Sequence, residues 1–584
     1  MKLNKYFILF FISVFIIEPT KSQPENYFRY PLDSFPHYVS PFGSLRDNHF
    51  HSGADLSTRQ QEGKIVYAAA TGYVSRIKVQ SGGYGKALYI AHPNGKTTVY
   101  GHLQNYYGDI EKWVKKYQYA NKTYEFDFIF NKPLILVSKG DSVAISGNSG
   151  TSTGPHLHFE IRDSKTEQIL NIAQFGLVQY DTIKPYIEQV NFYQFVPDGL
   201  ILTSNVKVNE NKLFTLNDSI NLFLDTILLE ADLYGIGINA WDLLNNNKNP
   251  TGIYSYTFWL NNVFKFKFAL NRFSFDKTKY INTHIDYPYY RLFGNRVQKA
   301  FLDDGNKINL YEADKMKGKF YVKADSLYQL MIKVEDNNNN KSYYLFIVKG
   351  KIAEPNNKKA AYLLQLEGRE KWLPGVENKY ILNDLQIYLD DDCLYDTMYV
   401  DIEEKAKTKQ TLANIYRIQQ YYQPLNKSFS ISIKPNENIK QKNKLLLGYA
   451  TKEGEIFRGA GGHYTNGVVT GNVSSFGFYT VLIDTLPPKV EQVFVNRVKN
   501  KQDSLSWNFR VTDNLTGIKS YNMYLNNHWV LAEYDAKNNL LTYFFDDIYE
   551  KQLAENRNKM VIKIIVSDAK GNTTTKEFKQ TIRM

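Results

Sequence analysis

The chain contains an internal repeat, in which three segments recur in the same order closer to the carboxyl end. The matched pairs are DTIKPYIEQVNFY (181–193) with DTLPPKVEQVFVN (484–496), NPTGIYSYTFWLNN (249–262) with NLTGIKSYNMYLNN (514–527), and MIKVEDNNNNKSYYLF (331–346) with IKIIVSDAKGNTTTKEF (562–578). Matches that keep their order indicate two copies of one folding unit. A chain of 584 residues is also too long for a single core. The sequence therefore predicts several domains.

The repeated units have the pattern of β-sandwiches. Each begins at a Pro-containing boundary and ends on Val-x-Asp, an Asn/Gly turn and another strand-like run. Short strands with frequent turns and no long helical pattern are typical of sandwiches that resemble immunoglobulin or fibronectin type III modules. We expect immunoglobulin-like sandwiches at 181–350, with long loops, and at 484–584. A further β-domain without a catalytic cluster is expected at 351–483. This likeness of fold identifies no function.

Composition limits the class of protein and its partners. The chain is 43% apolar and 15% aromatic, so it can form sizeable cores and is not disordered. A net charge of +12 suits an anionic partner, such as a cell-wall polymer, a membrane surface or nucleic acid. Codon bias toward Lys explains the same charge. We expect no nucleic acid binding, because Lys/Arg clusters interleaved with aromatics are missing. The one cysteine, Cys393, allows neither an intrachain disulfide nor a thiolate metal site.

The amino-terminal segment has the pattern of a signal peptide. A basic start, MKLNK, precedes the apolar run YFILFFISVFII of 12 residues, which is short of the roughly 20 needed to span a bilayer. We predict a signal peptide at 1–22 and cleavage before Gln23. No cysteine near the cut supports a lipid anchor, and no later stretch predicts an integral membrane segment. The expected location is the periplasm or the outer cell surface.

Histidines concentrate in the first part of the chain, where seven of the ten precede residue 160. Short β-type runs alternate there with Gly-rich turns, and HPNG between two such runs predicts a hairpin. In GPHLHFE (154–160), a strand would place His156 and His158 on one face and Leu157 in the core. One imidazole at this spacing can bind a metal while the other reaches the water on it.

A second motif, HSGAD, supplies the remaining donors of a metal site. His51 and Asp55 lie one turn apart around a permissive Gly53. A His, an Asp and a second His form a three-ligand zinc set. Three protein ligands leave the fourth tetrahedral position to water, which is the catalytic arrangement.

These motifs resemble the lysostaphin/LytM-like zinc endopeptidases, which cut peptidoglycan peptides. The resemblance covers about residues 37–175 and is carried by HSGADLS, GKIVYAAATGYVSRI, YGKALYIAH, TTVYGHL and KGDSVAISGNSGTSTGPHLHFEIRD. It implies a LytM-like zinc peptidase domain at 23–180, built on an antiparallel β-sheet. The fold class expected for the whole chain is therefore mainly β and multidomain.

The resemblance also implies a role for each motif residue. His51, Asp55 and His158 match the zinc ligands, and His156 matches the general base. His102, in YGHL, matches the histidine that orients the water or stabilises the oxyanion. Zinc brings the pKa of a bound water toward about 7, where a neutral histidine can accept its proton. All five residues are present.

Other polar residues have plainer interpretations. His49 is expected to be exposed or to support the ligands, and His92 to lie in a turn. The remaining histidines, at 37, 284, 463 and 528, are expected on the surface or in cores. Glu160 could support the ligands, but a salt bridge or an exposed strand position is expected. GNSGTSTG (147–154) lacks the ending of a phosphate-binding loop and predicts a tight turn that shapes the groove. It is not a nucleophile elbow either.

An insert at 104–138 departs from the family pattern, in which only a short stretch follows GHL. Ile110, Val114 and Tyr117 have the spacing of a short amphipathic helix, and YEFDFIF (124–130) alternates as a strand. Because the insert follows His102, we hypothesise a wall or lid of the groove. The alternatives are an extra packing element or a dock for a β-domain.

The leading functional hypothesis is a secreted zinc endopeptidase that hydrolyses peptide cross-links of peptidoglycan. Its expected partners are peptidoglycan stem peptides, with envelope proteins as possible partners of the β-domains, which would position the enzyme or shield its groove. One alternative is a catalytically silent envelope adaptor that binds wall peptides or activates a hydrolase. Another is a peptidase with a protein substrate.

Overall fold

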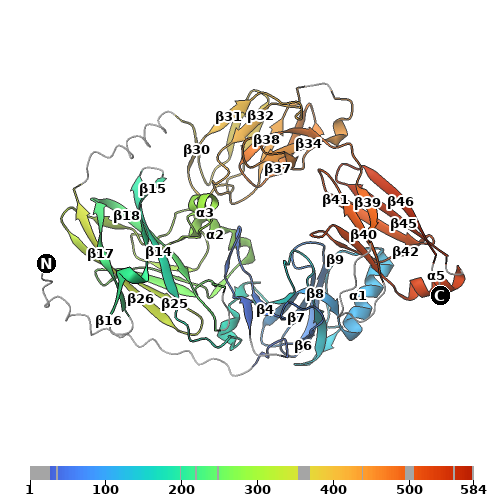
Figure 1. Ribbon diagram of the computed structural model, residues 1–584, viewed down its shortest axis with the longest axis horizontal. Helices are drawn as coiled ribbons and strands as arrows, with labels where there is room; N and C mark the ends of the chain where they lie inside the picture. The colour runs from blue at the N-terminus through green and yellow to red at the C-terminus, as the bar shows by residue number, and fades with distance from the viewer. Residues whose placement is uncertain are drawn as a thin grey trace.

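The computed structural model describes residues 27–33, 37–196, 199–216, 220–245, 249–352, 369–436, 439–493, 506–556 and 559–581. The predicted signal peptide, 1–22, lies outside the described residues. In the part that is described, no helix has the length and apolar character needed to cross a membrane. The chain is mostly β and consists of a sequence of β-rich domains, as its patterns predicted (Figure 1).

The first domain is built on an antiparallel sheet with the strand order β1-β4-β12-β8-β7-β6-β10. Its strands are β1 (Tyr38–Ser40), β4 (Ala54–Ser57), β12 (His156–Asp163), β8 (Lys96–Tyr106), β7 (Lys86–Ala91), β6 (Gly72–Val79) and β10 (Leu136–Val137). Shorter strands flank it: β2 (Leu45–Arg46), β3 (His49–Phe50), β5 (Ile65–Tyr67), β9 (Phe126–Ile129), β11 (Ser142–Ser146) and β13 (Ile169–Leu170). The short 3-10 helix η2 (Ile172–Phe175) follows. The predicted HPNG hairpin is confirmed, since it joins β7 to β8.

The register of the central strands positions the motif residues. β12 pairs with β4 on one side and with β8 on the other, so that His158 lies opposite both Asp55 and Gly101. The predicted strand through HLHFEI is confirmed, and Leu157 is fully buried in the core as expected. Two motifs that are about a hundred residues apart therefore meet on adjacent strands.

The insert forms the predicted helix and strand. Helix α1 (Gly108–Asn121) buries Ile110 and Val114, but its third buried residue is Gln118 rather than Tyr117. Tyr117 instead stacks on Trp113, and both rings contact Phe126 of β9. Strand β9 pairs with β6, which places the insert at the edge of the sheet away from β4.

The second domain consists of two sheets that share one hydrophobic core. One sheet contains β15 (Gly199–Lys207), β14 (Tyr186–Val196), β18 (Asp232–Trp241), β22 (Gln298–Lys299) and β24 (Phe320–Val322). The other contains β16 (Leu213–Leu216), β17 (Ile220–Glu230), β26 (Lys341–Lys351), β25 (Leu327–Glu335), β19 (Ser255–Leu260), β20 (Val263–Ala269) and β23 (Tyr311–Ala313). Its remaining elements are η3 (Glu210–Lys212), β21 (Arg272–Phe273), η4 (Phe275–Tyr280), α2 (Ile281–His284) and α3 (Tyr287–Phe293).

The third and fourth domains are also built from paired sheets around their own cores. The third contains β27 (Lys371–Trp372), β28 (Asn378–Leu382), β29 (Leu385–Leu389), β30 (Met398–Tyr399), β31 (Ile402–Lys405), β32 (Ile415–Ile418), β33 (Phe429–Ile433), η5 (Lys442–Lys444), β34 (Leu445–Ala450), β35 (Arg458–Gly459), β36 (His463–Thr465), β37 (Val468–Val473) and β38 (Gly477–Ile483). The fourth contains β39 (Lys489–Val493), β40 (Ser506–Thr512), β41 (Ile518–Leu525), β42 (His528–Val530), β43 (Ala532–Asp535), β44 (Leu540–Phe544), α5 (Asp547–Glu555), β45 (Lys559–Asp568) and β46 (Thr573–Thr581). The immunoglobulin-like relationship of the repeats stays a prediction.

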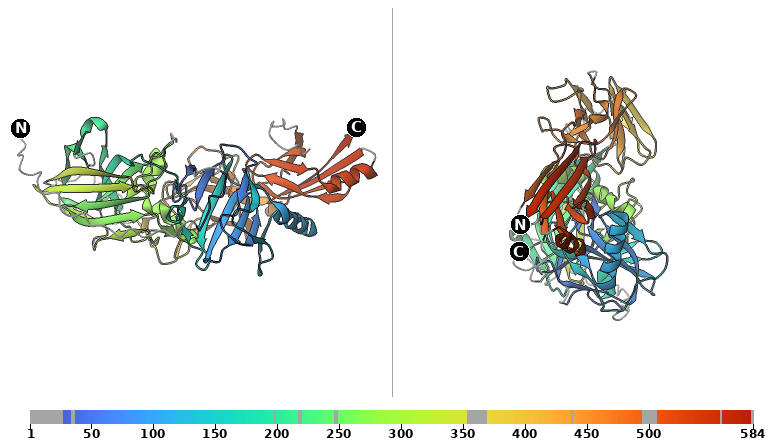
Figure 2. Two further views of the ribbon diagram at one scale, coloured as in Figure 1. Left: turned by 90° about the horizontal axis from the view of Figure 1, so that it is seen from below. Right: turned by 90° about the vertical axis from the view of Figure 1, so that its right-hand side faces the viewer.

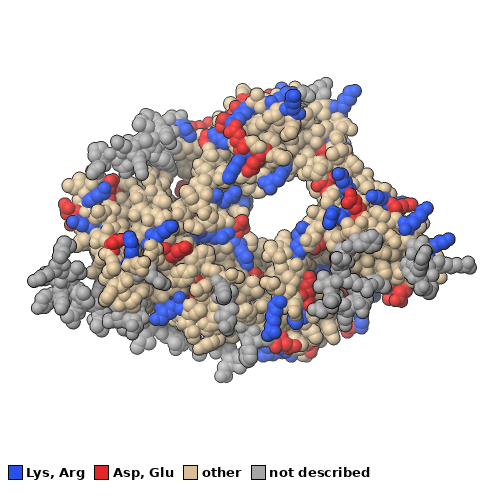
Figure 3. Space-filling model, viewed as in Figure 1, with Lys and Arg blue, Asp and Glu red and all other residues tan. Residues whose placement is uncertain are grey.

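The four domains form a ring, and an opening passes through its middle (Figures 1 and 3). The first two domains are joined by pairing of β13 with β21, and the last two by a bond from Lys570 Nζ to the carbonyl of Gly462. The fourth domain returns to the first, where Lys86 and Glu533 form an ion pair of 2.8 Å. Seen from below, the second and fourth domains lie at opposite ends, with the first between them (Figure 2).

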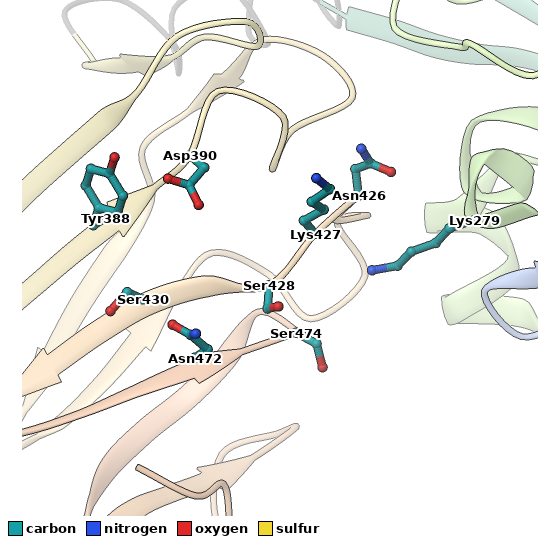
Figure 4. A pocket seen from close by; sticks show the side chains of 9 residues that line it. All are labelled: Lys279, Tyr388, Asp390, Asn426, Lys427, Ser428, Ser430, Asn472 and Ser474. Carbon is teal, nitrogen blue, oxygen red and sulfur yellow. The ribbon is translucent and has the colours of Figure 1, made fainter. Parts of the chain in front are cut away.

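The second and third domains meet at a polar pocket. Tyr395 Oη donates to the carbonyl of Lys279 at 2.7 Å, and the Lys279 side chain extends from η4 toward the third domain (Figure 4). The third domain contributes Tyr388, Asp390, Asn426, Lys427, Ser428, Ser430, Asn472 and Ser474. This contact completes the ring on the side opposite the Lys86–Glu533 pair.

Candidate metal centre

Three predicted ligands converge at the centre of the first domain. The distances are 3.0 Å from His51 Nε2 to Asp55 Oδ1, 3.0 Å from His158 Nδ1 to the same oxygen, and 3.2 Å between the two imidazole nitrogens. All three side chains are buried. Two nitrogens and a carboxylate oxygen this close together are a donor set for one cation.

Hydrogen bonds to the outer ring nitrogens orient the two histidine ligands. His51 Nδ1 lies 3.0 Å from the carbonyl oxygen of Pro41, which can only accept, so Nε2 is left as the lone-pair donor. His158 Nε2 lies 2.9 Å from Glu160 Oε1, so Nδ1 faces the centre. A carboxylate behind a ligating histidine fixes the ring and raises its basicity.

Glu160 lies at the centre of a buried hydrogen-bond network. It is fully buried, accepts from Arg162 Nε at 2.6 Å, and accepts from Tyr84 Oη at 2.5 Å. The expected exposed position for Glu160 is therefore wrong, whereas the expected salt bridge is confirmed. Burial acts to raise the pKa of Glu160, but the charge of Arg162 and the bond from His158 hold it well below its usual range. The carboxylate behind His158 is thus ionised.

At the centre, each ionised side chain stabilises the charged form of its neighbours. Burial alone would lower the pKa of His158, but bonds to the Asp55 and Glu160 carboxylates raise it to about 9. Burial likewise acts to raise the pKa of Asp55, and the surrounding histidines outweigh it and keep the carboxyl ionised. Arg46 Nη2 donates to Asp55 Oδ2 at 3.0 Å, which leaves Oδ1 facing the three imidazoles.

His156 and His102 lie beside the ligands, and a backbone carbonyl holds each ring at Nδ1. His156 Nδ1 lies 2.8 Å from the carbonyl oxygen of Gly154, and its Nε2 lies 3.2 Å from Asp55 Oδ1. His102 Nδ1 lies 2.8 Å from the carbonyl oxygen of Ser149. Because both carbonyls can only accept, a neutral His102 carries its proton on Nδ1 and can accept at Nε2. His156 also donates from Nδ1, but its Nε2 faces the carboxylate oxygen of Asp55, to which it can donate as well. Burial and the neighbouring His158 and His156 lower the pKa of His102 to about 3.

Local backbone geometry explains how His102 reaches this position. It has a φ of 58°, which a non-glycine residue seldom adopts. The register between β8 and β7 shifts at this point, from Tyr100 paired with Leu88 to Leu103 paired with Lys86. A bulge of this kind re-aims one side chain of a strand, and strained residues cluster at functional sites.

Two glycines permit the close approach of the strands. A Cβ on Gly53 would lie 2.4 Å from the carbonyl oxygen of Phe159 and 3.0 Å from His158 Cε1. A Cβ on Gly101 would lie 3.3 Å from that of His158. The reason for Gly53 in HSGAD is therefore contact with β12, since its φ is not positive.

The metal centre opens into a groove with a volume of about 910 Å³. Basic side chains from the first domain line it, together with Ser274, Phe275 and Asp276 of the second domain. A second hollow borders Asp55 and His156 from the other side, and its far wall includes Trp241 and Thr251 of the second domain. The second domain therefore contributes to the groove and to this neighbouring hollow.

The insert does not form a lid. The lining of the groove includes no residue of 104–138, a range that the structure describes in full. The insert instead contacts the fourth domain, where Tyr119 packs edge-on against Trp529 and donates to Asp546. The lid hypothesis is wrong because β9 pairs with β6 at the edge of the sheet and α1 contacts β8 and β11, away from the groove lining. The alternative of a dock for a β-domain is confirmed.

The fourth domain also touches the loop that orients the histidines. Lys537 Nζ donates to the carbonyls of Asn148 and Ser152, the latter at 3.0 Å. The same loop supplies the carbonyls of Ser149 and Gly154 to His102 and His156. Sequence reasoning missed this contact, because an exposed lysine about 385 residues away carries no pattern.

The other histidines lie outside the centre. His49 is exposed at the rim of the groove, and its Nδ1 bonds to the carbonyl of Asp47. His92 is buried at the predicted turn and bonds to Thr71 and Thr98. His284 lies in the core of the second domain, where burial lowers its pKa to about 4. Sequence reasoning also missed Tyr84, which stacks on His158, although it stands in the quoted YGKALYIAH.

The donor set fits zinc in a catalytic geometry. Imidazole nitrogens and one carboxylate are ligands that zinc accepts, and three of them leave one position open. His51, Asp55 and His158 would hold the ion, with the groove at its open side. Glu160 and the carbonyl of Pro41 already orient the ligands.

Comparison with known families agrees with these motifs. Residues 49–123 match Peptidase family M23, a range that includes His51, Asp55 and His102, and residues 370–484 match the Zu5-like domain. The chain therefore carries an M23, LytM-like peptidase domain, as predicted. The second match falls on the third domain.

Curated relatives match only part of the chain. An uncharacterized metalloprotease of Haemophilus influenzae is 34% identical over 142 residues, which are 23% of this chain and 25% of that protein. The DD-carboxypeptidase/endopeptidase Mpg of Neisseria meningitidis is 33% identical over 128 residues, 21% of this chain and 24% of that protein. The chain thus spans about a quarter of the length of these relatives.

Solved structures match a similar share. A zinc-containing peptidase from Vibrio cholerae is 28% identical and covers 23% of this chain and 36% of its own, with a TM-score of 0.18. The catalytic domain of lysostaphin from Staphylococcus simulans is 22% identical and covers 22% of this chain and 82% of its own, with a TM-score of 0.16.

Proposed function

We propose that the chain is an exported zinc metalloendopeptidase that hydrolyses peptide cross-links of bacterial peptidoglycan. The observation that carries this proposal is the complete set of five motif residues around one point of an open groove. A bound zinc ion would polarise the scissile carbonyl and lower the pKa of a water molecule. The match to family M23 supports the same class of reaction.

The protein's own residues divide the proton transfers. With Asp55 engaged in holding the metal, His156 would keep its own proton on Nδ1, which faces the carbonyl of Gly154, and Nε2 would take a proton from the attacking water and return it to the leaving amine. His102 has the same tautomer, which favours orientation of the water over donation to the oxyanion. The carbonyls of Gly154 and Ser149 hold both rings in place.

The groove suits an anionic peptide polymer. Its charged lining consists of four basic residues, Arg46, Arg76, Lys78 and Arg162, and three acidic ones, Asp55, Glu167 and Asp276. An excess of basic groups in a cleft raises the local concentration of an oppositely charged substrate. Since the second domain supplies Ser274, Phe275 and Asp276, it contributes directly to substrate choice. We also propose that the β-domains place the enzyme on its substrate.

Export rests on the amino-terminal pattern. The basic start and the apolar run of 12 residues are typical of a signal peptide. A peptidoglycan substrate lies beyond the cytoplasmic membrane, so we propose the periplasm or the outer surface as the location. Determining the amino terminus of the mature protein checks this, with Gln23 as the expected first residue.

Digestion of purified sacculi tests the activity. The zinc-loaded protein should release soluble muropeptides, a chelator should stop the release, and added zinc should restore it. Mass spectrometry of the fragments identifies the cleaved bond. Release that persists in the chelator would contradict the proposed metal chemistry. Binding to sacculi without any release would instead support the adaptor hypothesis, which the intact ligand set disfavours.

A further inference from the structure

Each copy of the internal repeat contains a cluster of three aspartates. In the second domain Asp181, Asp242 and Asp336 each place a carboxylate oxygen within 4.8 Å of the other two, and all three residues are at most 4% exposed. The fourth domain has the same cluster, formed by Asp484, Asp513 and Asp568. Neither cluster shares a residue with the histidine site.

Several of these oxygens have no hydrogen-bond partner. Asp181 Oδ2 and Asp242 Oδ1 are buried and unpartnered in the first cluster. Asp484 Oδ1 and Asp513 Oδ1 are buried and unpartnered at the corresponding places in the second. A buried carboxylate oxygen without a donor is costly, because charge is desolvated and nothing compensates it. The same two positions remain unpartnered in both copies.

The surrounding turns hold the two clusters in matching geometry. In the first, Asn340 Nδ2 donates to Asp336 Oδ2 at 2.7 Å and to the carbonyl of Asp181 at 3.1 Å. In the second, Asn572 Nδ2 donates to Asp568 Oδ2 at 2.7 Å and to the carbonyl of Asp484 at 3.1 Å.

Backbone donors hold the third aspartate of each cluster. Asp336 Oδ1 accepts from the backbone of Asn338 and Asn340, and Asp568 Oδ1 accepts from that of Lys570 and Asn572. The corresponding distances are 2.8 and 2.9 Å in both copies. The turns thus hold the carboxylates together against their mutual repulsion, although the first copy has a longer loop between Asp242 and Thr251.

Burial and the crowding of negative charge raise the pKa values of aspartates in both clusters. Burial, then the charges of Asp336 and Asp181, raise the pKa of Asp242 to about 8. Burial also raises the pKa of Asp336 and of Asp484, with their neighbouring aspartates adding to the effect. At neutral pH such a cluster must take up a proton or a cation.

We infer that each aspartate cluster binds one divalent cation with the coordination chemistry of calcium. The donors are carboxylate oxygens, which suit hard cations rather than zinc or copper. Calcium accepts six to eight oxygens in flexible geometry, whereas magnesium prefers a strict octahedron with several waters. Three preplaced carboxylates supply at least three of these six to eight oxygens. In each cluster two buried carboxylate oxygens also lack a hydrogen-bond partner.

The position of each cluster gives the cation a structural role. Asp181 stands where the chain enters the second domain, and Asn338 Nδ2 donates to the carbonyl of Gln179 in the preceding segment. Gln179 in turn accepts from the backbone of Tyr38 in β1, the strand next to the one that carries Asp55. In the fourth domain, Lys444 Nζ of the third domain donates to the carbonyl of Lys570. Each cation therefore stabilises a joint between two domains.

Calcium binding to the full chain tests this inference without an activity readout. The chelator-treated protein is reloaded with zinc and titrated with calcium chloride by calorimetry. We expect two calcium ions per chain, with dissociation constants on the order of 10⁻⁴–10⁻³ M or tighter, the range of extracellular modules and sensors. No binding at calcium concentrations of about 10 mM, ten times the weaker end of that range, would overturn the inference.

Isosteric variants assign the ions to the clusters. Asp242→Asn and Asp513→Asn should each reduce the stoichiometry to one ion, and the double variant should bind none. Asp225→Asn is the matched control, since Asp225 lies in the second domain but is exposed and paired with Lys212. Two ions bound to the double variant would overturn the assignment.

Amide hydrogen exchange covers the case of a variant that folds poorly. Calcium should slow the exchange of the turns 336–340 and 568–572 in the wild-type protein. In Asp242→Asn only the second turn should respond. Without calcium, this variant should be at least as heat-stable as the wild type, because it removes a like charge from a buried cluster. Unchanged exchange of both turns in wild-type protein with calcium would contradict the inference.

Discussion

The histidine centre of the first domain and the aspartate cluster of the second differ in donor atoms and in access to solvent. His51, Asp55 and His158 combine nitrogen and oxygen donors and line an open groove. The cluster at Asp181 consists of carboxylates alone, and its members are at most 4% exposed. Both are three-residue clusters in β-domains, and the first has a groove of about 910 Å³ beside it.

This difference distinguishes a catalytic metal site from a structural one. Nitrogen donors and an open position suit a zinc ion that acts on substrate, whereas closed oxygen donors suit an ion that stabilises a fold. The groups that hold the ligands in place also differ between the two clusters. Behind His158 lies an ionised Glu160 that increases ligand basicity, whereas the aspartates are held by turn amides that only place them. We therefore expect the protein to depend on two metals in two separable ways.

The largest effect is expected from loss of a zinc ligand. His51→Ala should abolish zinc binding and lower the hydrolysis rate by at least the amount lost with a general base, about 10²–10⁴-fold. Calcium binding should remain at two ions, because the aspartate clusters share no residue with the centre. Metal analysis by mass spectrometry and muropeptide release check both statements.

His156→Ala is the matched control for that variant. His156 is close to the ligands but is predicted to move protons, so the variant should retain zinc and still lose about 10²–10⁴-fold in rate. Stoichiometric zinc in His51→Ala would refute the ligand set. Loss of zinc from His156→Ala would show that this residue ligates instead.

A smaller effect is expected from the carboxylate behind His158. Glu160→Gln keeps the shape of the side chain but removes the charge that supports His158, so zinc affinity should fall about 10–100-fold. The control is Glu167→Gln, because Glu167 also pairs with Arg162 but is 64% exposed. Competition with a zinc-binding dye measures the affinity. Equal affinities of the two variants would contradict the role of Glu160.

The aspartate cluster should instead reveal itself in the pH dependence of stability. Asp242 has a raised pKa of about 8, caused first by burial and then by Asp336 and Asp181. An acid with a raised folded pKa contributes stability that is complete below its unfolded pKa and is lost as pH rises to the folded value. Without calcium, the second domain should therefore lose stability between about pH 4 and pH 8.

Calcium and Asp242→Asn separate the causes of that slope. Calcium favours the ionised cluster, so saturating calcium should reduce the loss of stability, and the Asn variant should lack the contribution of Asp242 altogether. Thermal unfolding of the full chain at several pH values, with hydrogen exchange to identify the domain, makes the measurement. A slope that is the same in wild type and variant would contradict the assigned cause.

The sequence could predict the histidine centre because its residues occur in short motifs on two paired strands. The spacing of HLH determines which side chains share a face, and HSGAD adds the other donors. Glu160 and Arg162 follow His158 at the same spacing of two in this strand, so the face that they share was predictable. Tyr84 comes from a turn before β7, and no motif specifies the direction of its side chain. The supporting network was therefore incompletely predicted.

Contacts between domains were not predictable in this way. The repeat predicted two related β-units, and five of the six aspartates stand in or directly beside the matched segments, whereas Asp242 precedes its segment by seven residues. Their convergence depends on how the two sheets of each unit close, which strand periodicity does not specify. The groove wall at Phe275 and the docking of the insert on Trp529 likewise depend on rigid placement of separate domains.

The smallest effect is expected where the fourth domain reaches the first. Lys537 donates to the loop whose carbonyls orient His102 and His156, but an exposed lysine contributes little, up to about 1 kcal/mol. Lys537→Ala should therefore lower the rate at most about fivefold, with zinc and calcium contents unchanged. Lys551→Ala, an exposed lysine of α5 in the same domain, is the control and should have the rate of the wild type. A loss of zinc from Lys537→Ala would show that the contact between the fourth and first domains is needed for zinc binding. The catalytic and structural metal sites would then not be independent of each other.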